Sequence, residues 1–252
     1  MEKKIVELKK ISAGYDRKII LKDINLEVRE RDFIGVIGPN GGGKTTLLKI
    51  ILGLIKPFNG DLTYFFSGNQ KNNGSAIGYL PQQNSFDRQF PITVSEVILS
   101  GLISRRKFLR SLSRDFSDRL DEILELTAMK DHRNRPIGDL SGGQMQRVFL
   151  GRAIISKPEL LILDEPDTFV DNRFERELYQ ILQELNQHMA ILLVSHDVGT
   201  ISSYIKTIAC VNNVLHYHPS NIISSEQLKV YNCPIDIITH GTVPHRVLHD
   251  HK

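Results

Sequence analysis

The chain has 252 residues, of which 40% are hydrophobic and 24% charged, so it is long enough for one large α/β domain and too apolar to be disordered. A net charge of +3 argues against a nucleic-acid-binding face, and the lack of an apolar run of roughly eighteen residues argues against a membrane-spanning helix. The charged start over Met1–Val6 and the presence of only two cysteines, Cys210 and Cys233, lead us to expect a cytosolic protein that reaches a membrane through a partner.

Two half-exposed antiparallel strands are predicted near the start of the chain. Apolar and polar residues alternate over 5–11 and 19–28, which is the pattern of a strand with one buried face. The side chains expected to point inward on the second strand are Leu21, Ile24, Leu26 and Val28. These strands are expected to form an antiparallel edge of the fold.

A glycine-rich segment, Gly38–Thr45, follows with the spacing G-x-x-x-x-G-K-[ST] of a phosphate-binding loop. The apolar run Phe33–Ile37 predicts a buried strand before it, and Thr46–Leu52 predicts a helix after it, which is the order that this motif requires. Glycines let successive backbone N–H groups point at a phosphate, and the helix N-terminus adds partial positive charge. Lys44 is expected to reach the outer phosphates, and the Thr45 hydroxyl to ligate Mg²⁺. The segment therefore predicts an ATP or GTP site.

A helical insertion is predicted near residues 90–155, after short strands at 61–66 and 77–80 and a polar hairpin tip at 67–75. Thr93 begins the insertion with capping-box spacing to the next glutamate, and apolar residues then recur at helical spacing. The apolar positions of its two helices are Val94, Val97, Ile98 and Leu102, then Leu120, Ile123 and Leu124. Between them, the basic run at 105–110 is either a solvated surface or a docking surface for a protein or for lipid headgroups.

A second candidate anion site begins at Leu140–Gln144, which has the sequence Leu-Ser-Gly-Gly-Gln. Its Ser-Gly-Gly start opens a helix predicted over 144–155, so the serine hydroxyl and the first N–H groups face whatever lies ahead of the helix. This helix terminus is far from Lys44 in the sequence, so the chain has two separate elements suited to phosphate.

Apolar runs over 160–163 and 191–194 predict further strands of a mostly parallel sheet, with a helix over 173–185 between them. Asp164 and Glu165 follow the first of these runs, and parallel sheets place ligands at the carboxyl ends of their strands. Asp164 is expected to hold Mg²⁺ through water, and Glu165 to orient or deprotonate the attacking water. A strand that merely ends in a solvated turn would show the same pattern.

The order of the phosphate loop, Leu-Ser-Gly-Gly-Gln and Leu163-Asp164-Glu165 resembles the ATP-binding subunit of an ABC transporter, over residues 4–215. The resemblance implies an α/β P-loop NTPase fold, with a RecA-like, mostly parallel sheet, an antiparallel β edge subdomain and an inserted helical subdomain. The division that it implies is a nucleotide-binding core at 1–90 and 158–215, a helical subdomain at 91–157 and a histidine-rich extension at 216–252.

The resemblance also implies roles for single residues. Gln82 is similar to the switch-loop glutamine that touches Mg²⁺ and the attacking water, and His196 to the switch histidine that contacts the γ-phosphate. Tyr15 lies where the family places an aromatic ring against adenine, and Asp171 matches an aspartate of the loop after the catalytic glutamate. The implied catalytic residues are Glu165, His196 and Gln82, and the implied Mg²⁺ ligands are Thr45, Gln82 and Asp164. The residues implied to bind ATP are Tyr15, Gly38, Pro39, Asn40, Gly41, Gly42, Gly43, Lys44, Thr45, Thr46, Ser141, Gly142, Gly143, Gln144 and Asp171.

Within this superfamily, Gly41–Thr46 and the stretch from Tyr79 to Val94 are similar to the ATPases of zinc/manganese importers and their iron relatives. This likeness implies a homodimer that clamps ATP between the phosphate loop of one copy and the signature helix of the other. The dimer would lie beneath a membrane permease that is fed by an extracytoplasmic substrate-binding protein. Two alternatives stay open: a soluble ABC ATPase of the iron–sulfur cluster assembly type, and an importer ATPase for siderophore or cobalamin.

The tail carries six of the nine histidines together with Cys233. These histidines are His216, His218, His240, His245, His249 and His251. Imidazole and thiolate suit Zn²⁺, but the spacing matches no standard ligand set, so the tail is either an accidental polar segment or a cytosolic metal-sensing site.

Overall fold

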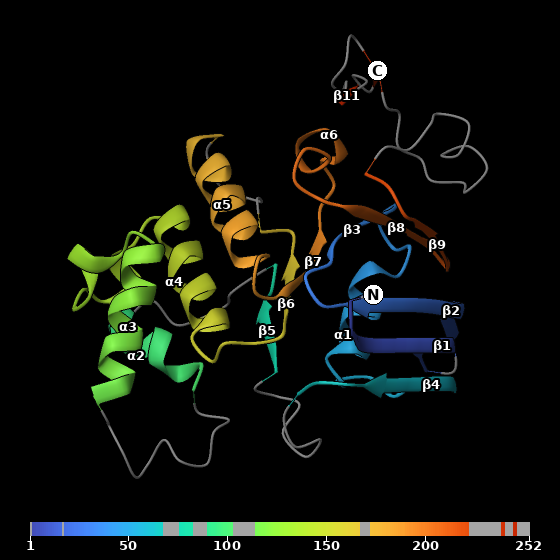
Figure 1. The fold of residues 1–252 in the computed structure, drawn as a ribbon, viewed down its shortest axis with the longest axis horizontal. Helices are drawn as coiled ribbons and strands as arrows, with labels where there is room; N and C mark the ends of the chain where they lie inside the picture. The colour runs from blue at the N-terminus through green and yellow to red at the C-terminus, as the bar shows by residue number, and fades with distance from the viewer. Residues whose placement is uncertain are drawn as a thin grey trace. The chain divides into compact units, whose positions relative to one another are not determined.

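The structure, a computed structural model, describes residues 2–16, 18–67, 76–82, 90–102, 114–166, 172–221, 238–239 and 244–245. The chain forms two compact units, residues 1–65 with 190–252 (unit 1) and residues 66–189 (unit 2) (Figure 1). The strands and helices of unit 1 are β1 (Lys4–Tyr15), β2 (Lys18–Arg29), β3 (Phe33–Ile37), α1 (Lys44–Ile51), β4 (Asn59–Tyr64), β7 (Ala190–Val194), α6 (Val198–Ile201), β8 (Thr207–Asn212), β9 (Val214–His218), β10 (Ile238–Thr239) and β11 (Pro244–His245). Those of unit 2 are β5 (Ile77–Leu80), α2 (Val94–Ser100), α3 (Arg114–Leu126), the short 3₁₀ turns η2 (Lys130–His132) and η3 (Ile137–Asp139), α4 (Gly142–Ile154), β6 (Leu160–Asp164) and α5 (Asn172–Leu185).

The antiparallel sheet of unit 1 has the order β2-β1-β4, which confirms the antiparallel strands predicted at the start of the chain. The four side chains expected to point inward from β2 are all buried. The third strand begins at Asn59 and ends at Tyr64, two residues earlier than predicted. A Cβ on Gly60 would lie 2.3 Å from the carbonyl oxygen of Lys10, so the glycine lets β4 approach β1 where the ladder is irregular, and the pairing reaches back to Asn59.

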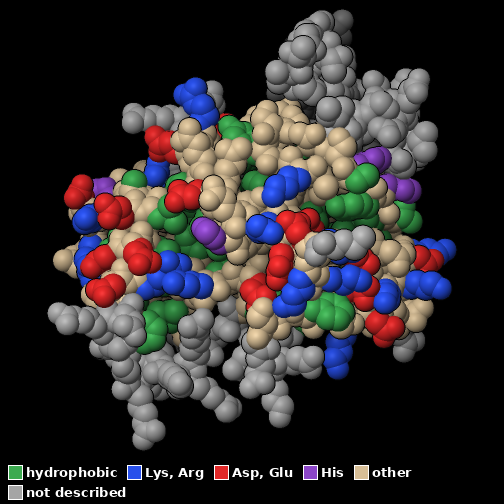
Figure 2. Space-filling model, in the orientation of Figure 1, with side chains coloured by type: hydrophobic (Ala, Val, Ile, Leu, Met, Phe, Trp, Pro, Cys, Tyr) green, Lys and Arg blue, Asp and Glu red, His purple; other side chains and the backbone are tan. Residues whose placement is uncertain are grey.

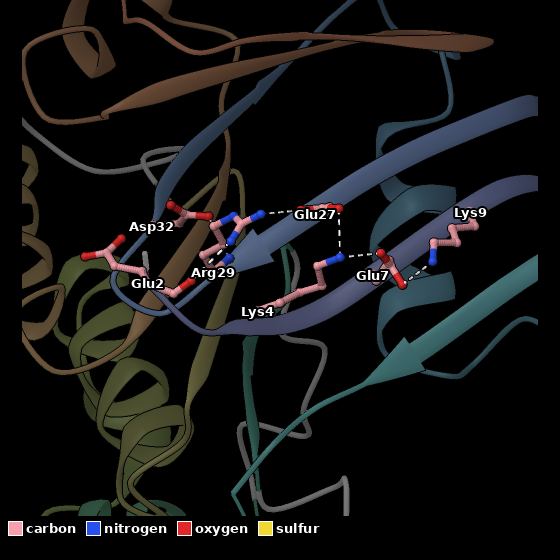
Figure 3. A network of polar contacts seen from close by, with 7 residues as sticks. All are labelled: Glu2, Lys4, Glu7, Lys9, Glu27, Arg29 and Asp32. Carbon is pink, nitrogen blue, oxygen red and sulfur yellow. Dashed lines mark hydrogen bonds and ion pairs between the residues drawn. The ribbon is translucent and has the colours of Figure 1, made fainter.

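The outer face of this sheet carries a network of charged side chains (Figure 3). Lys4 donates hydrogen bonds to Glu7 on its own strand and, at 2.8 Å, to Glu27 on β2. Glu27 also accepts a hydrogen bond of 2.6 Å from Arg29, and Lys9 lies 2.9 Å from Glu7. Basic and acidic side chains are accordingly interspersed over β1 and β2 on the surface (Figure 2). Because Glu7 and Glu27 are directly opposite each other, the two lysines offset a repulsion between like charges.

The second sheet of unit 1 is mostly parallel and has the strand order β7-β3-β8-β9. Every residue of β3 and β7 is buried, as expected for the continuous apolar runs of strands covered on both faces. β8 is parallel to β3, whereas β9 turns back antiparallel to β8 through a tight turn at Asn213. The apolar runs of the sequence predicted β3 and β7, whereas β8 was not predicted.

Unit 2 combines the parallel strand pair β5 and β6 with a group of packed helices. Helix α2 begins at the predicted capping box, in which the Thr93 N–H donates to Glu96 at 2.8 Å. Gly151 of α4 lets neighbouring helices come close, because a Cβ there would lie 2.9 Å from Ile123 and 3.3 Å from Ile98. The predicted hairpin tip beyond residue 67 and the basic run at 105–110 lie outside the described residues. Among the helices that the structure describes, none combines the length and apolar character that crossing a bilayer requires.

Candidate nucleotide site

The phosphate loop of unit 1 connects the buried strand β3 to helix α1. Gly38, Gly41 and Gly43 all have positive φ, at +147°, +76° and +103°. A Cβ on Gly38 would lie 2.0 Å from the carbonyl oxygen of Val211, and one on Gly43 would lie 2.5 Å from a methyl group of Leu21. Both the backbone conformation and the space therefore require glycine at these positions. The predicted strand–loop–helix order is confirmed.

Lys44 is the first residue of α1 and is only 6% exposed. Its ammonium donates hydrogen bonds to the carbonyl oxygens of Gly38 and Pro39, at 2.9 and 3.0 Å, so it is held over the loop itself. A buried ammonium at the start of a helix favours an anion there. Thr45, in contrast, is exposed on the first turn of α1, where its hydroxyl can reach a ligand. The loop thus fits a phosphate chain.

Asn213, which the sequence analysis did not single out, supports the loop from the β8–β9 turn. Its backbone N–H donates to the carbonyl oxygen of Gly42 at 2.9 Å. Its own carbonyl accepts from the N–H of Lys22 at 2.8 Å, and its side chain donates to the carbonyl of Ile20 at 2.9 Å. With φ at +59°, the residue adopts the left-handed conformation that asparagine tolerates. The Asn-Asn pair between two apolar runs signals a turn, but no local pattern reveals the bond to Gly42.

Tyr15 ends β1 with its side chain 42% exposed. The ammonium of Lys49, one helix turn beyond the phosphate loop on α1, lies 5.8 Å from the centre of its ring. The ring is therefore held beside the helix that begins at the loop, and its exposure leaves it available for stacking. Adenine binding by Tyr15 stays a prediction.

His196 lies at the same edge of the unit 1 sheet as the phosphate loop. Val36 of β3 is paired with Val194 of β7, and Gly38 and His196 each follow two residues later. His196 is half-buried, between Ser195, whose hydroxyl accepts from the N–H of Asp197 at 3.0 Å, and Asp197 itself. The Asp197 carboxylate accepts from the Thr200 N–H at 3.1 Å, which fixes the start of α6. The turn that carries His196 is thus well defined.

The two carboxylates of unit 2 end strand β6. Asp164 is 3% exposed, and Glu165 follows with φ at +51°, which turns the chain sharply away from the strand. The side-chain amide of Gln82 donates to a carboxylate oxygen of Glu165 at 2.5 Å, so the structure brings these two predicted residues together. Burial, and after it the charge of Asp164, raise the pKa of Tyr79 to about 12, so that phenol stays neutral beside the aspartate.

The predicted second anion site is the N-terminus of α4. Ser141 caps the helix: its hydroxyl accepts from the N–H of Gln144 at 3.3 Å, and its N–H donates to the Gln144 side chain at 3.1 Å. No acidic residue lies in the first turn, and Ser141 and Gly142 are exposed. The partial positive charge of the helix start is therefore open to an anion.

The remaining predicted residues are less informative. Asp171 and most of the tail lie outside the described residues, as does the side chain of His245. His216 and His218 lie on one face of β9, opposite Cys210 and Ile208 of β8. Burial, and after it the neighbouring His216, lower the pKa of His218. In the described part of the chain, no three His, Cys, Asp or Glu side chains come together in a way that could hold a metal ion.

Comparison with known proteins identifies the family. The family model described as "ABC transporter" matches residues 21–168. The chain belongs to the ABC transporter family. This ABC ATPase is 40% identical over 214 residues to the zinc uptake system ATP-binding protein ZurA of Listeria monocytogenes, with 83% of each chain covered. It is 38% identical over 200 residues to the manganese transport system ATP-binding protein MntB of Bacillus subtilis, covering 79% of this chain and 80% of that one.

The fold of the ABC ATPase is also found in solved structures. A nucleotide-free ATP-binding cassette from an ABC transporter superimposes with a TM-score of 0.76, at 23% identity, over 91% of this chain and 95% of that chain. The expected fold class and family are therefore confirmed. As a member of this family, the chain is an ATPase domain that binds nucleotide.

Proposed function

We propose that this ABC ATPase hydrolyses ATP to power the import of zinc or manganese through a separate membrane permease. The observation that carries the proposal is the phosphate loop, in which Lys44 is held over Gly38 and Pro39, and a Cβ on Gly38 or Gly43 would collide with its neighbours. The metal cargo is supported by the relatives, which are named for zinc uptake and manganese transport. A chelated iron cargo belongs to the same proposal.

ATP would be held mainly by unit 1. The backbone N–H groups of the loop and the ammonium of Lys44 would bind the phosphates, Tyr15 would stack on adenine, and His196 would contact the γ-phosphate. Mg²⁺ would be held by Thr45, Gln82 and Asp164, and when bound it offsets the negative charge of the outer phosphates. The hydroxyl, amide and carboxylate oxygens of these residues are the donors that Mg²⁺ prefers.

Hydrolysis would use Gln82, which follows β5, and Glu165, which follows β6. Glu165 would accept a proton from water as the water oxygen attacks the γ-phosphorus, while Gln82 holds the carboxylate in place. The bond from the γ-phosphorus to the bridging oxygen would break, giving ADP and phosphate. Lys44 and His196 would stabilise the charge that develops on the phosphoryl oxygens.

A second copy of the chain would complete the site. The capped start of α4 at Ser141 would bind the γ-phosphate held by the loop of the partner, with Gly142, Gly143 and Gln144 contributing to that contact and Asp171 lying at the joint. Loss of the γ-phosphate on hydrolysis would open the dimer.

The permease would dock on the helical part of unit 2, for which the boundaries 91–157 are proposed, while 1–90 and 158–215 form the nucleotide-binding core. A surface pocket of about 310 Å³ lies there, lined by Phe90, Ile92, Val97, Ser100, Ile137, Phe149 and Arg152. Phe90 is 61% exposed and borders this pocket, so the pocket presents apolar surface to a partner. This docking would place the ATPase on the inner face of the membrane and couple it to an extracytoplasmic binding protein.

The proposal is tested by metal uptake in cells that express this ATPase together with a candidate membrane permease. Cells with the wild-type ATPase should accumulate zinc or manganese, and cells with Glu165→Gln should not, although both proteins are present in membranes with the permease. Equal uptake in the two strains, with ATP hydrolysis confirmed for the purified wild type, would exclude the transport role and favour a soluble ABC ATPase. Uptake of a siderophore or cobalamin instead would replace the metal cargo.

A further inference from the structure

We propose that His132 is a positioning residue for the signature helix α4, and that it holds the helix start in its phosphate-binding form only while its ring is neutral. The inference rests on the proposed role of that helix start. His132 lies on the turn η2 and is half-buried. Its ring nitrogen Nε2 is 3.1 Å from the side-chain nitrogen Nε2 of Gln144.

The direction of this contact follows from the capping box. The backbone N–H of Ser141 can only donate, and it points at Oε1 of Gln144 at 3.1 Å. The oxygen end of the Gln144 amide is therefore committed to Ser141, so its nitrogen end faces His132. An amide nitrogen also only donates. The ring nitrogen of His132 must then be the acceptor, which requires a neutral ring with its proton on Nδ1.

A charged ring cannot keep both contacts. Imidazolium carries a proton on each nitrogen, so its Nε2 would meet the donor end of the Gln144 amide. If the amide rotated to offer its oxygen to His132, the N–H of Ser141 would face an NH₂ group instead. One of the two hydrogen bonds is lost in either case. Because the bond at Ser141 is half of the cap of α4, protonation of His132 disturbs the helix end that is proposed to meet the γ-phosphate.

Several charged residues near His132 form ion pairs with one another, and the ring nitrogen Nε2 of His132 contacts the side-chain amide of Gln144. The charged residues of η2 and the segment after it are Lys130, Asp131, Arg133 and Arg135. Helix α3 carries Arg114, Asp115, Asp118, Arg119, Asp121, Glu122 and Glu125, and α4 carries Arg147 and Arg152. The ion pairs that engage several of them are Lys130 with Glu125, Arg133 with Asp121, Arg119 with Glu122, and Arg147 with Glu177. Asp121, Glu122 and Glu125 of α3 are thus engaged by other cations. The amide of Gln144 is the polar group that the structure places against Nε2 of the ring.

The tautomer can be measured directly. In the protein labelled with ¹⁵N in its histidine rings, NMR at neutral pH should show His132 protonated at Nδ1 and unprotonated at Nε2. In Gln144→Ala, which removes the donor, that preference should be lost. A proton on Nε2 of His132 in the wild type would overturn the proposal. This measurement needs no nucleotide, so it decides the contact even if the proposed function is wrong.

The functional arm compares the pH dependence of ATP hydrolysis in wild type and His132→Gln. Glutamine places an oxygen near the position of Nε2 that accepts at every pH. We expect the wild type to lose several-fold more of its activity than the variant between about pH 7.5 and about pH 6, the range in which histidines change charge. His188→Gln is the matched control, because His188 is exposed after α5, and it should behave like the wild type.

Identical relative profiles for wild type and His132→Gln would overturn the proposal, because the acid loss would then come from another group. A complete lack of hydrolysis at every pH in the wild type would instead contradict the proposed function. The two failures are therefore distinguishable.

Discussion

The side-chain nitrogen of Gln82 lies 2.5 Å from a carboxylate oxygen of Glu165, and each residue follows the paired positions Leu80 and Leu163 by two. The parallel register of β5 and β6 therefore delivers the two side chains to the same sheet edge. The same rule places His196 beside the phosphate loop in unit 1. In each unit, residues that follow paired strand positions by the same number of residues emerge at the same edge of the parallel sheet. The candidate site residues of each unit are therefore brought together by the strand register.

We first predict that Glu165→Gln lowers the rate of ATP hydrolysis by about 10²- to 10⁴-fold, because the amide cannot accept the proton of the attacking water. ATP affinity should change little, since the phosphates are held by the loop. Phosphate release and ATP titration measure the two effects. The matched control is Glu184→Gln, which changes an exposed glutamate of α5 and should hydrolyse ATP like the wild type.

Sedimentation of Glu165→Gln with ATP should show a dimer, and a monomer at saturating ATP would contradict the proposed arrangement in which two copies bind ATP between them.

Lys44→Ala should weaken ATP binding by about two orders of magnitude, because a charge-assisted contact to phosphate is lost. Isothermal titration calorimetry gives the affinity. The matched variant is Lys22→Ala, which removes an exposed ammonium from β2 and leaves the loop intact. If Lys44→Ala bound ATP as tightly as Lys22→Ala, the role given to Lys44 would be wrong.

Gly38→Ala and Gly41→Ala separate the steric and conformational demands of the phosphate loop. Both residues have positive φ, so alanine brings strain of about 1–2 kcal/mol at either position. Only at Gly38 would the added Cβ collide with the Val211 carbonyl, at 2.0 Å, whereas nothing lies within 4 Å at Gly41. Gly38→Ala should therefore lose ATP binding and lower the melting temperature much more than Gly41→Ala does. Equal effects would show that Val211 moves aside.

The charged network on β1 and β2 should make stability depend on pH. Hydrogen bonds from Lys4 lower the pKa of both Glu7 and Glu27, below the carboxyl value of the unfolded chain. The network therefore stabilises the fold above about pH 4.3, the ordinary value for glutamate, and this contribution is lost as the pH falls through the lower folded values. Hydrogen bonds from Glu27 and then Glu7 raise the pKa of Lys4, so the same contribution is also lost in strong alkali.

The comparison that checks this is urea unfolding of the wild type and Glu27→Gln. At pH 7 the variant should be less stable, and the difference should shrink toward zero below about pH 4 as the glutamates of the wild type become protonated. A difference that is the same at both pH values would assign the effect to packing rather than charge.

Short-range patterns were enough to predict much of the fold and part of the site. The capping box at Thr93 involves residues three apart, so its spacing alone reveals the start of a helix. At Ser141 the helix was predicted from residue 144, and it begins at Gly142 because the serine caps it. The phosphate loop could be predicted for the same reason, because its glycines and Lys44 lie within one short segment of the sequence, Gly38–Thr45. The resemblance implied that Gln82 and Glu165 both act on the attacking water, and the structure joins the two side chains by a direct hydrogen bond.

Contacts between distant segments could not be predicted in this way. The bond between Asn213 and Gly42 depends on how β8 pairs with β3, and no periodicity in either segment encodes that pairing. The contact between His132 and Gln144 likewise depends on the packing of η2 against α4. The early start of β4 depends on an irregularity in β1, a strand more than forty residues earlier in the sequence.

The turn at Asn213 has a practical consequence for engineering this protein. An exposed two-strand corner is the usual choice for inserting an epitope, a fluorescent reporter or a new chain terminus. Here the Asn213 N–H donates a hydrogen bond to Gly42 in the loop that is proposed to bind the nucleotide. An insertion between Asn212 and Val214 would therefore disturb nucleotide binding. Grafts elsewhere on the surface are the safer choice.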